Sequence, residues 1–109
     1  MVIDREMLVP LKRVEIVIDE DDFEEFQEIC RAINIRGYTY ITHAGGFGSR
    51  GNRRPNDMPL PEKNILVIIA CTEEQAETLA KNISSRMKEI GGIFLISDCD
   101  WVKGPKISY

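Results

Sequence analysis

The sequence has 109 residues, of which 43% are hydrophobic and 29% charged, and its formal net charge at pH 7 is −4. Such a length and composition indicate one globular domain, residues 1–109, with a single modest core, and exclude a disordered chain. The acidic balance disfavours a general nucleic-acid binder or a protein attached to anionic membranes. The longest apolar run, residues 65–71, is too short to cross a bilayer.

The first half of the chain predicts a strand, a helix and a second strand. Residues 1–10 are expected to form a loose arm that ends at Pro10, and alternation over 12–19 predicts the first strand. Helical spacing of apolar side chains predicts a helix over about 22–33, with Asp21 and Glu24 as its N-terminal cap. β-Branched and aromatic residues predict a strand over 38–42.

Residues 44–63 form the least regular part of the sequence. This segment contains four glycines, three prolines and three arginines but almost no core-forming residues. Long loops in compact domains are usually functional. We therefore expect 44–63 to be a mobile loop that contacts a ligand or a partner.

The second half repeats the pattern of strand, helix and strand. The apolar run 64–71 is typical of a central strand covered on both faces. Thr72 and Gln75 have the spacing of a capping box, and apolar residues at helical spacing then continue to Ile90. Gly91 and Gly92 end this helix; residues 93–101 form the last strand and 102–109 the C-terminal tail.

The element order therefore predicts a ferredoxin-like α+β fold, βαββαβ. In this plan an antiparallel four-stranded sheet carries both helices on one face. The strands nevertheless place apolar side chains, among them Val17 and Val67, on both faces. A monomer would expose the uncovered side, so we expect an oligomer that buries it.

The glycine-rich stretch at the start of the 44–63 loop is the strongest candidate for a binding site. Clustered glycines in 45–51 let successive backbone N–H groups converge on an anion, and Arg50 adds a positive charge. The stretch lacks the Gly-Lys-Ser/Thr ending of a nucleotide-triphosphatase loop and does not open a helix as a dinucleotide fingerprint does.

With these residues in place, the sequence resembles the PII signalling superfamily. Gly37-Tyr38-Thr39 and Gly46-Phe47-Gly48 are similar to the strand and loop base that precede the T-loop of those proteins. Gly45-Gly46, Gly48-Ser49-Arg50 and Pro55-Asn56 resemble the PII-like branch linked to inorganic carbon. That branch includes the SbtB type, which partners a bicarbonate transporter, and a carboxysome-associated type.

The resemblance implies a homotrimer that binds an adenine nucleotide (AMP, ADP, ATP or cyclic AMP), together with bicarbonate, in clefts between subunits. The loop base of one subunit would meet the region around the second helix and last strand of its neighbour. The implied nucleotide- or anion-binding residues are Gly37, Tyr38, Thr39, Gly46, Phe47, Gly48, Ser49, Arg50, Gly51, Gly92 and Lys103. A T-loop over 44–63 would signal to a protein target such as a bicarbonate transporter or a carboxysome component.

Several residues depart from the nitrogen-regulatory PII pattern. Arg50 replaces a glutamine that helps to hold Mg²⁺ and 2-oxoglutarate in those proteins, and the loop after the second helix is shortened to Gly91-Gly92. Of the basic C-terminal motif only Lys103 and Lys106 remain, and no tyrosine lies in 44–63. These departures argue against ATP with 2-oxoglutarate and against uridylylation of the loop.

Other functions fit the sequence less well. An RNA-recognition module shares the element order but should display aromatic side chains on its third strand, and 64–70 has none. A metal-tolerance trimer of the CutA type should carry a cluster of metal ligands, which is missing. The sequence shows no nucleophile–base pair, no zinc-ligand pattern and no CxxC motif. We therefore expect a cytoplasmic regulatory protein, without covalent cofactor or resident metal, rather than an enzyme.

Overall fold

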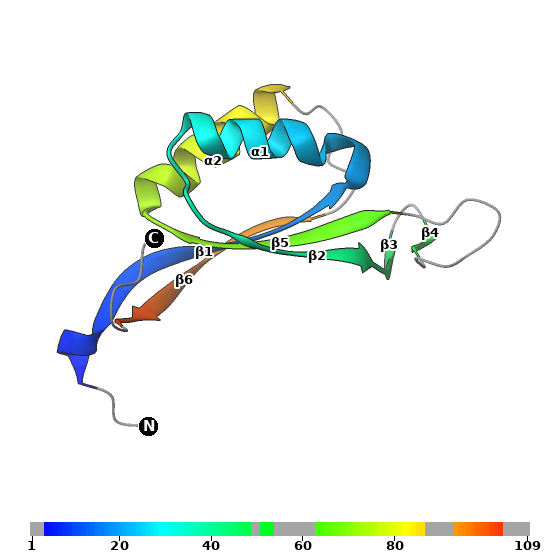
Figure 1. Ribbon diagram of the computed structural model, residues 1–109. Helices are drawn as coiled ribbons and strands as arrows, with labels where there is room; N and C mark the ends of the chain where they lie inside the picture. Colours follow the sequence, from blue (N-terminus) through cyan, green and yellow to red (C-terminus); the bar gives the residue numbers. More distant parts are fainter. Residues whose placement is uncertain (1–3, 49–50, 54–62, 87–92, 104–109) are drawn as a thin grey trace.

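The computed structural model describes residues 4–48, 51–53, 63–86 and 93–103 (Figure 1). Its main sheet has four antiparallel strands in the order β2-β5-β1-β6, and α1 and α2 cover one face. The strands of the sheet and the helices that cover it are β1 (Leu8–Asp19), α1 (Phe23–Ala32), β2 (Thr39–Ala44), β5 (Asn64–Cys71), α2 (Glu73–Arg86) and β6 (Phe94–Val102). The ferredoxin-like plan predicted from the sequence is confirmed.

The N-terminal residues form structure where a loose arm was expected. A short 3₁₀ helix, η1 (Arg5–Met7), leads into β1, and the strand then runs through Pro10. Pro10 lies opposite Asp100 of β6, whereas pairing of β1 with β5 begins only at Lys12. A proline lacks the N–H needed for a ladder and is tolerated where no partner strand accepts it. The prediction that Pro10 ends an unstructured arm was therefore wrong for residues 4–10.

The start of α1 also differs from the prediction. A 3₁₀ turn, η2 (Glu20–Asp22), intervenes, and the Asp19 carboxylate accepts a 3.2 Å hydrogen bond from the Asp21 N–H. Asp19 thus caps η2, and Asp21 does not cap α1. The spacing of Asp21 and Glu24 suggested the wrong cap because Asp19 occupies the same role two residues earlier.

The end of α1 is set by Asn34, whose φ is 65°. The N–H of Ile35 donates to the carbonyl of Cys30 at 2.9 Å, and the N–H of Asn34 donates to the carbonyl of Arg31 at 3.2 Å. These two bonds and the left-handed residue form a Schellman motif. The buried Ile35 side chain follows, so the chain turns back directly toward β2.

The start of α2 has the predicted capping box. The Thr72 N–H donates to Gln75 Oε1 at 3.0 Å, and the Gln75 N–H donates to Thr72 Oγ1 at 3.1 Å. The last part of the predicted helix, residues 87–90, lies outside the described residues. Among the described residues no helix is long and apolar enough to cross a membrane.

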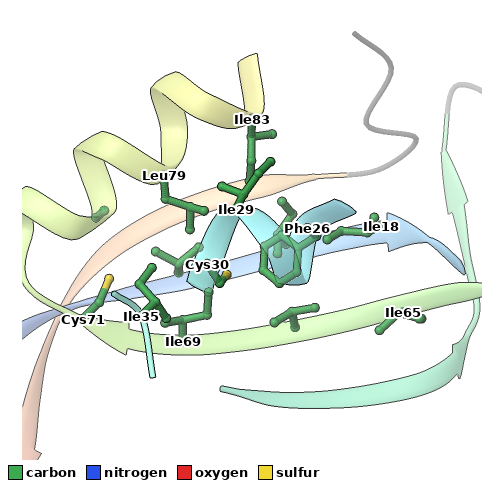
Figure 2. Packing of buried hydrophobic residues seen from close by; sticks show 14 residues of the cluster. Ile18, Phe26, Ile29, Cys30, Ile35, Ile65, Ile69, Cys71, Leu79 and Ile83 are labelled. Atoms are coloured by element: carbon green, nitrogen blue, oxygen red, sulfur yellow. The ribbon is translucent and has the colours of Figure 1, made fainter. Parts of the chain in front are cut away.

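The core lies between the helices and the covered face of the sheet (Figure 2). Phe26 and Ile29 of α1 and Leu79 and Ile83 of α2 point toward β1 and β5. The buried cluster consists of Val14, Ile16, Ile18, Phe26, Ile29, Cys30, Ile35, Ile65, Val67, Ile69, Cys71, Ala76, Leu79 and Ile83. Full burial of one such side chain stabilises the fold by roughly 1.5–3 kcal/mol, so this layer holds the domain together.

The opposite face of the sheet is open, and beside the ion pair of Arg13 and Glu15 it carries an apolar row across three strands. The pairing register aligns Ile41, Leu66 and Val17 across β2, β5 and β1. Ile41 remains 53% exposed, and Leu95 of β6, further along the same face, 51%. In β5 only alternate residues after Ile65 are fully buried, so the described part of one chain does not supply the expected cover on both faces. An exposed apolar row of this kind is typical of a surface that another chain covers.

Candidate ligand-binding site

The predicted loop base follows the edge strand β2 and continues into a small hairpin. Strands β3 (Gly46–Gly48) and β4 (Gly51–Arg53) pair antiparallel, with Gly48 opposite Gly51. The first part of this loop therefore contains a regular two-stranded ladder. The composition of 44–63 did not predict this ladder. Ser49, Arg50 and residues 54–62 lie outside the described residues, so the predicted roles of Ser49 and Arg50 remain predictions.

Two glycines of the loop base leave space beside the backbone. A Cβ atom added at Gly37 or at Gly46 would meet no heavy atom within 4 Å in the described part of the chain. Packing within the described part of this chain therefore does not require a glycine at either position. A ligand or a second chain that approaches the backbone would require one.

Tyr38, the second residue of the predicted binding set, takes part in the core. Its ring packs edge-on against Phe26 of α1, with a centroid distance of 5.8 Å, and the residue is half-buried. Tyr40 similarly packs against Phe23 at 4.8 Å. The aromatic rings thus anchor β2 to α1, and the exposed Thr39 lies between them on the open face, opposite Ile68.

A β-bulge separates this anchored part of β2 from the glycines. Ile41 pairs with Leu66 and Ala44 pairs with Asn64, so β2 contains one residue more than its partner. His43 absorbs the extra length with a φ of 60°. A bulge bends its strand and changes the direction in which the next residues leave the sheet. His43 thus acts through its backbone at the base of the loop.

The sequence analysis did not single out two arginines at the end of α1, Arg31 and Arg36. A hollow of about 290 Å³ next to the end of α1 is lined by Gln27, Cys30, Arg31, Asn34, Ile35, Arg36 and Tyr38. Arg36 Nε donates to Asn34 Oδ1 at 3.4 Å, and both arginines are exposed. The signal in the sequence was the position of Arg36 directly before Gly37. The hollow offers positive charge to an anion near the start of β2.

Lys103, also in the predicted set, lies at the other end of the sheet. Its N–H donates a 2.7 Å hydrogen bond to the carbonyl oxygen of Met7, beyond the start of β1. Ala44, by contrast, is level with Asp19, because both are paired with Asn64. The steps along β1 from Met7 to Asp19 separate these two levels by roughly 40 Å at about 3.3 Å per residue. One chain cannot bring both ends of the set to one small ligand.

A second hollow, of about 520 Å³, lies near the end that carries Lys103. It is lined by Pro10, Leu11, Lys12, Glu73, Asp98, Cys99 and Asp100. Lys12 forms an ion pair with Asp98, and this hydrogen bond raises the pKa of the lysine. Asp98 is therefore engaged in the interstrand pair of β1 and β6, which gives it a structural role.

The remaining residues of the set are described in part or not at all. The backbones of Phe47, Gly48 and Gly51 form the β3–β4 hairpin, and the Phe47 side chain lies outside the described part of the structure. Gly92 lies outside the described residues. The structure thus groups the loop-base residues along β2 and β3 and places Lys103 apart from them.

Comparison with solved structures supports the same architecture. CPII, a nitrogen regulatory PII-like protein from Thiomonas intermedia K12 bound to ADP, AMP and bicarbonate, matches with a TM-score of 0.77 and 23% identity, over 88% of this chain and 92% of CPII. A protein from Thermus thermophilus described as PII-like and signalling matches with a TM-score of 0.69 and 26% identity, over 87% of this chain and 92% of the other.

The sequence itself matches a known protein family. No curated protein sequence matches this chain significantly. The sequence model of the family described as nitrogen regulatory protein P-II matches residues 11–104, which is most of the chain. The βαββαβ order, the glycine-rich extension of β2 and this match agree with the resemblance seen in the sequence. The chain therefore belongs to the nitrogen regulatory protein P-II family.

Proposed function

We propose that this protein is a PII-like regulatory sensor in the cytoplasm. It binds an adenine nucleotide, with bicarbonate as a second effector, in the clefts between the subunits of a homotrimer. The 44–63 segment is its T-loop, which orders with the ligand and is recognised by a protein target. We place that target in the metabolism or transport of inorganic carbon, a bicarbonate transporter or a carboxysome component. The effectors of this function bind non-covalently. The function requires no catalytic residues.

The separation of the loop base from Lys103 is the observation that carries the proposal. The two ends lie roughly 40 Å apart along β1. A ligand that uses both must therefore bind between two chains. Intersubunit clefts of a cyclic trimer bring unlike ends together at each of three equivalent interfaces.

The open face of the sheet supports the assembly. Ile41, Leu66 and Val17 form one apolar row across three strands, and Ile41 is more than half exposed. Three such faces packed around one axis remove this surface from water. Each Å² of apolar surface buried stabilises the trimer by about 25 cal/mol.

Two kinds of observation support the ligand class. Structures of CPII, which shares the fold, are described as bound to ADP, AMP and bicarbonate, and as bound to ADP and bicarbonate. In this chain, Gly37 and Gly46 leave open space beside the backbone, and Arg31 and Arg36 line a hollow next to Gly37. Open backbone and positive charge suit a phosphate or carbonate group.

Isothermal titration calorimetry with AMP, ADP, ATP and cyclic AMP, each with and without bicarbonate, tests the proposal. We expect micromolar or tighter binding of at least one nucleotide, and a Gly46→Ala variant with at least tenfold weaker binding. The added methyl group meets open space in the chain, so the free energy of unfolding of the free protein should change by less than about 1 kcal/mol. Ser84→Ala, on an exposed turn of α2, is the control.

Two results would contradict the proposal. The first is that no nucleotide of the panel binds to the parent protein. The second is that Gly46→Ala and the control bind the same nucleotide as tightly as the parent, which would place the ligand away from the loop base.

A further inference from the structure

The first strand and the last strand extend together past the rest of the sheet. Residues 8–11 pair with residues 99–102, whereas the pairing of β1 with β5 starts at Lys12. Figure 1 shows this two-stranded ribbon projecting beyond the layer of α1 and α2. The match to the P-II family model begins at residue 11, so residues 4–10 precede the matched part of the chain.

The hydrogen bonds of the ribbon follow from its register. The bonds from Lys103 to Met7 and from Val17 to Ile93 belong to one antiparallel ladder, in which hydrogen-bonded pairs alternate. The alternation makes Val9 and Trp101 a hydrogen-bonded pair. Pro10 and Asp100 form a non-hydrogen-bonded pair, in which the residue of β1 donates no N–H to β6. Pro10 thus interrupts no hydrogen bond between β1 and β6.

The N-terminal end of the ribbon is itself held by a capped turn. The Asp4 side chain accepts a 3.0 Å hydrogen bond from the Glu6 N–H, and the Asp4 carbonyl accepts one from the Met7 N–H at 2.9 Å. The Met7 carbonyl in turn accepts the bond from Lys103. An ordered turn of three residues therefore fixes the backbone of Lys103 at the point where β6 has ended.

We propose that residues 4–10 are a positioning element of the ligand site: they hold the end of β6 so that Lys103 reaches the phosphate of a nucleotide bound against the neighbouring subunit. This inference rests on the proposed function. The Lys103 side chain is exposed and supplies the positive charge, and the N-terminal segment supplies its position. A charge held in place in advance loses less conformational entropy when it binds a phosphate.

The ribbon can be perturbed without damage to the core. None of residues 4–10 or 99–103 belongs to the buried cluster between the helices and the sheet. Val9→Pro removes the N–H that pairs with Trp101, while Val9→Ala shortens the same side chain and keeps the N–H. The two variants therefore separate the pairing of the ribbon from the side chain at position 9.

The test compares ADP binding by calorimetry in full-length parent protein, Val9→Pro, Val9→Ala, Lys103→Ala and the double variant Val9→Pro/Lys103→Ala. We expect Lys103→Ala to lose about ten- to a hundredfold in affinity, the range of one charge-assisted hydrogen bond. Val9→Pro should lose at least half as much binding free energy as Lys103→Ala, which corresponds to an affinity about three- to tenfold lower. Val9→Ala should lose less than about threefold in affinity. The double variant should bind no more weakly than Lys103→Ala alone, because both changes remove the same contact.

Amide exchange at Trp101 and Lys103 shows whether the ribbon has opened in Val9→Pro, and a chain that starts at Leu11 removes the segment outright. Parent-like affinity in either variant overturns the inference, as does an additive loss in the double variant. A parent protein that does not bind ADP contradicts the proposed function instead. The two failures are thereby distinguished.

Discussion

The side-chain amide of Gln75 donates a 3.1 Å hydrogen bond to the backbone carbonyl of Asn34. The same side chain accepts the capping bond from Thr72 through its oxygen. Gln75 thus joins the first turn of α2 to the left-handed residue that ends α1. The chain continues from Asn34 through Arg36 into Gly37, so this bond fixes the connection that carries the loop base.

Gln75→Glu should destabilise the protein by about 1 kcal/mol, the value of one hydrogen bond in a folded protein. A glutamate keeps the acceptor for Thr72 but loses the amide that donates to Asn34. Urea unfolding measures the change. Glu74→Gln, an exposed substitution in the same turn, is the control, and equal stability of both variants would show that the link to Asn34 contributes nothing.

Thr72→Ala should also cost about 1 kcal/mol, because it removes the side-chain acceptor for the N–H of Gln75. Helix propensity does not explain the loss, since Thr72 precedes the helix. Circular dichroism during thermal unfolding should show the loss, and Thr72→Ser should restore most of it. A serine variant as unstable as the alanine variant would exclude the cap as the cause.

Leu66→Glu should convert the oligomer to monomers. Leu66 lies on the open face between Ile41 and Val17, where a carboxylate would lose its hydration on assembly. Sedimentation equilibrium at micromolar concentration measures the mass, and Ser84→Glu on the outer face of α2 is the control. A parent protein that is itself monomeric would remove the reason for an intersubunit site.

The stability of the protein should fall as the pH rises from about 9 to about 12, in part through Cys30. Burial, with a smaller contribution from Cys71, raises the pKa of Cys30 from 9.0 to about 12. In that range the thiol ionises in the unfolded chain but not in the native protein, so unfolding releases a proton and becomes easier. Cys30→Ala should show a shallower decline, and parallel curves for variant and parent would refute the shifted pKa.

Arg50→Ala should weaken binding of the nucleotide or of bicarbonate about ten- to a hundredfold, the range of one charge-assisted hydrogen bond. Arg53→Ala should weaken it less, because Arg53 is further along the loop. Calorimetry with the parent's preferred ligand measures both. Equal affinity of Arg50→Ala and the parent would place the anion elsewhere.

Local patterns in the sequence were sufficient for the main elements of the fold. The apolar run of β5 and the Thr72–Gln75 spacing depend on neighbours within a few residues, and both the strand and the cap are confirmed. Pro10 was misread because the sequence does not show which edge of a strand faces a partner. The bulge at His43 was missed because a residue other than glycine gives little sign of a positive φ.

The candidate site was predictable only along β2. Gly37, Tyr38, Thr39 and Gly46 are close in sequence, so their grouping followed from the strand itself. The separation of Lys103 from them depends on the strand order β2-β5-β1-β6, and its bond to Met7 joins residues at opposite ends of the chain. Such long-range pairing is set by the whole sheet, and no local motif encodes it.

The most direct test of a ligand site shared between two chains is a subunit-mixing titration of Gly46→Ala with Lys103→Ala. Each variant alone should bind ADP weakly, because every cleft carries one defect. After equal amounts are dissociated and reassembled together, about a quarter of the clefts in cyclic trimers should combine an intact loop base with an intact Lys103. Calorimetry should then show tight binding at that fraction of sites. A mixture that binds ADP no better than the separate variants would contradict the account.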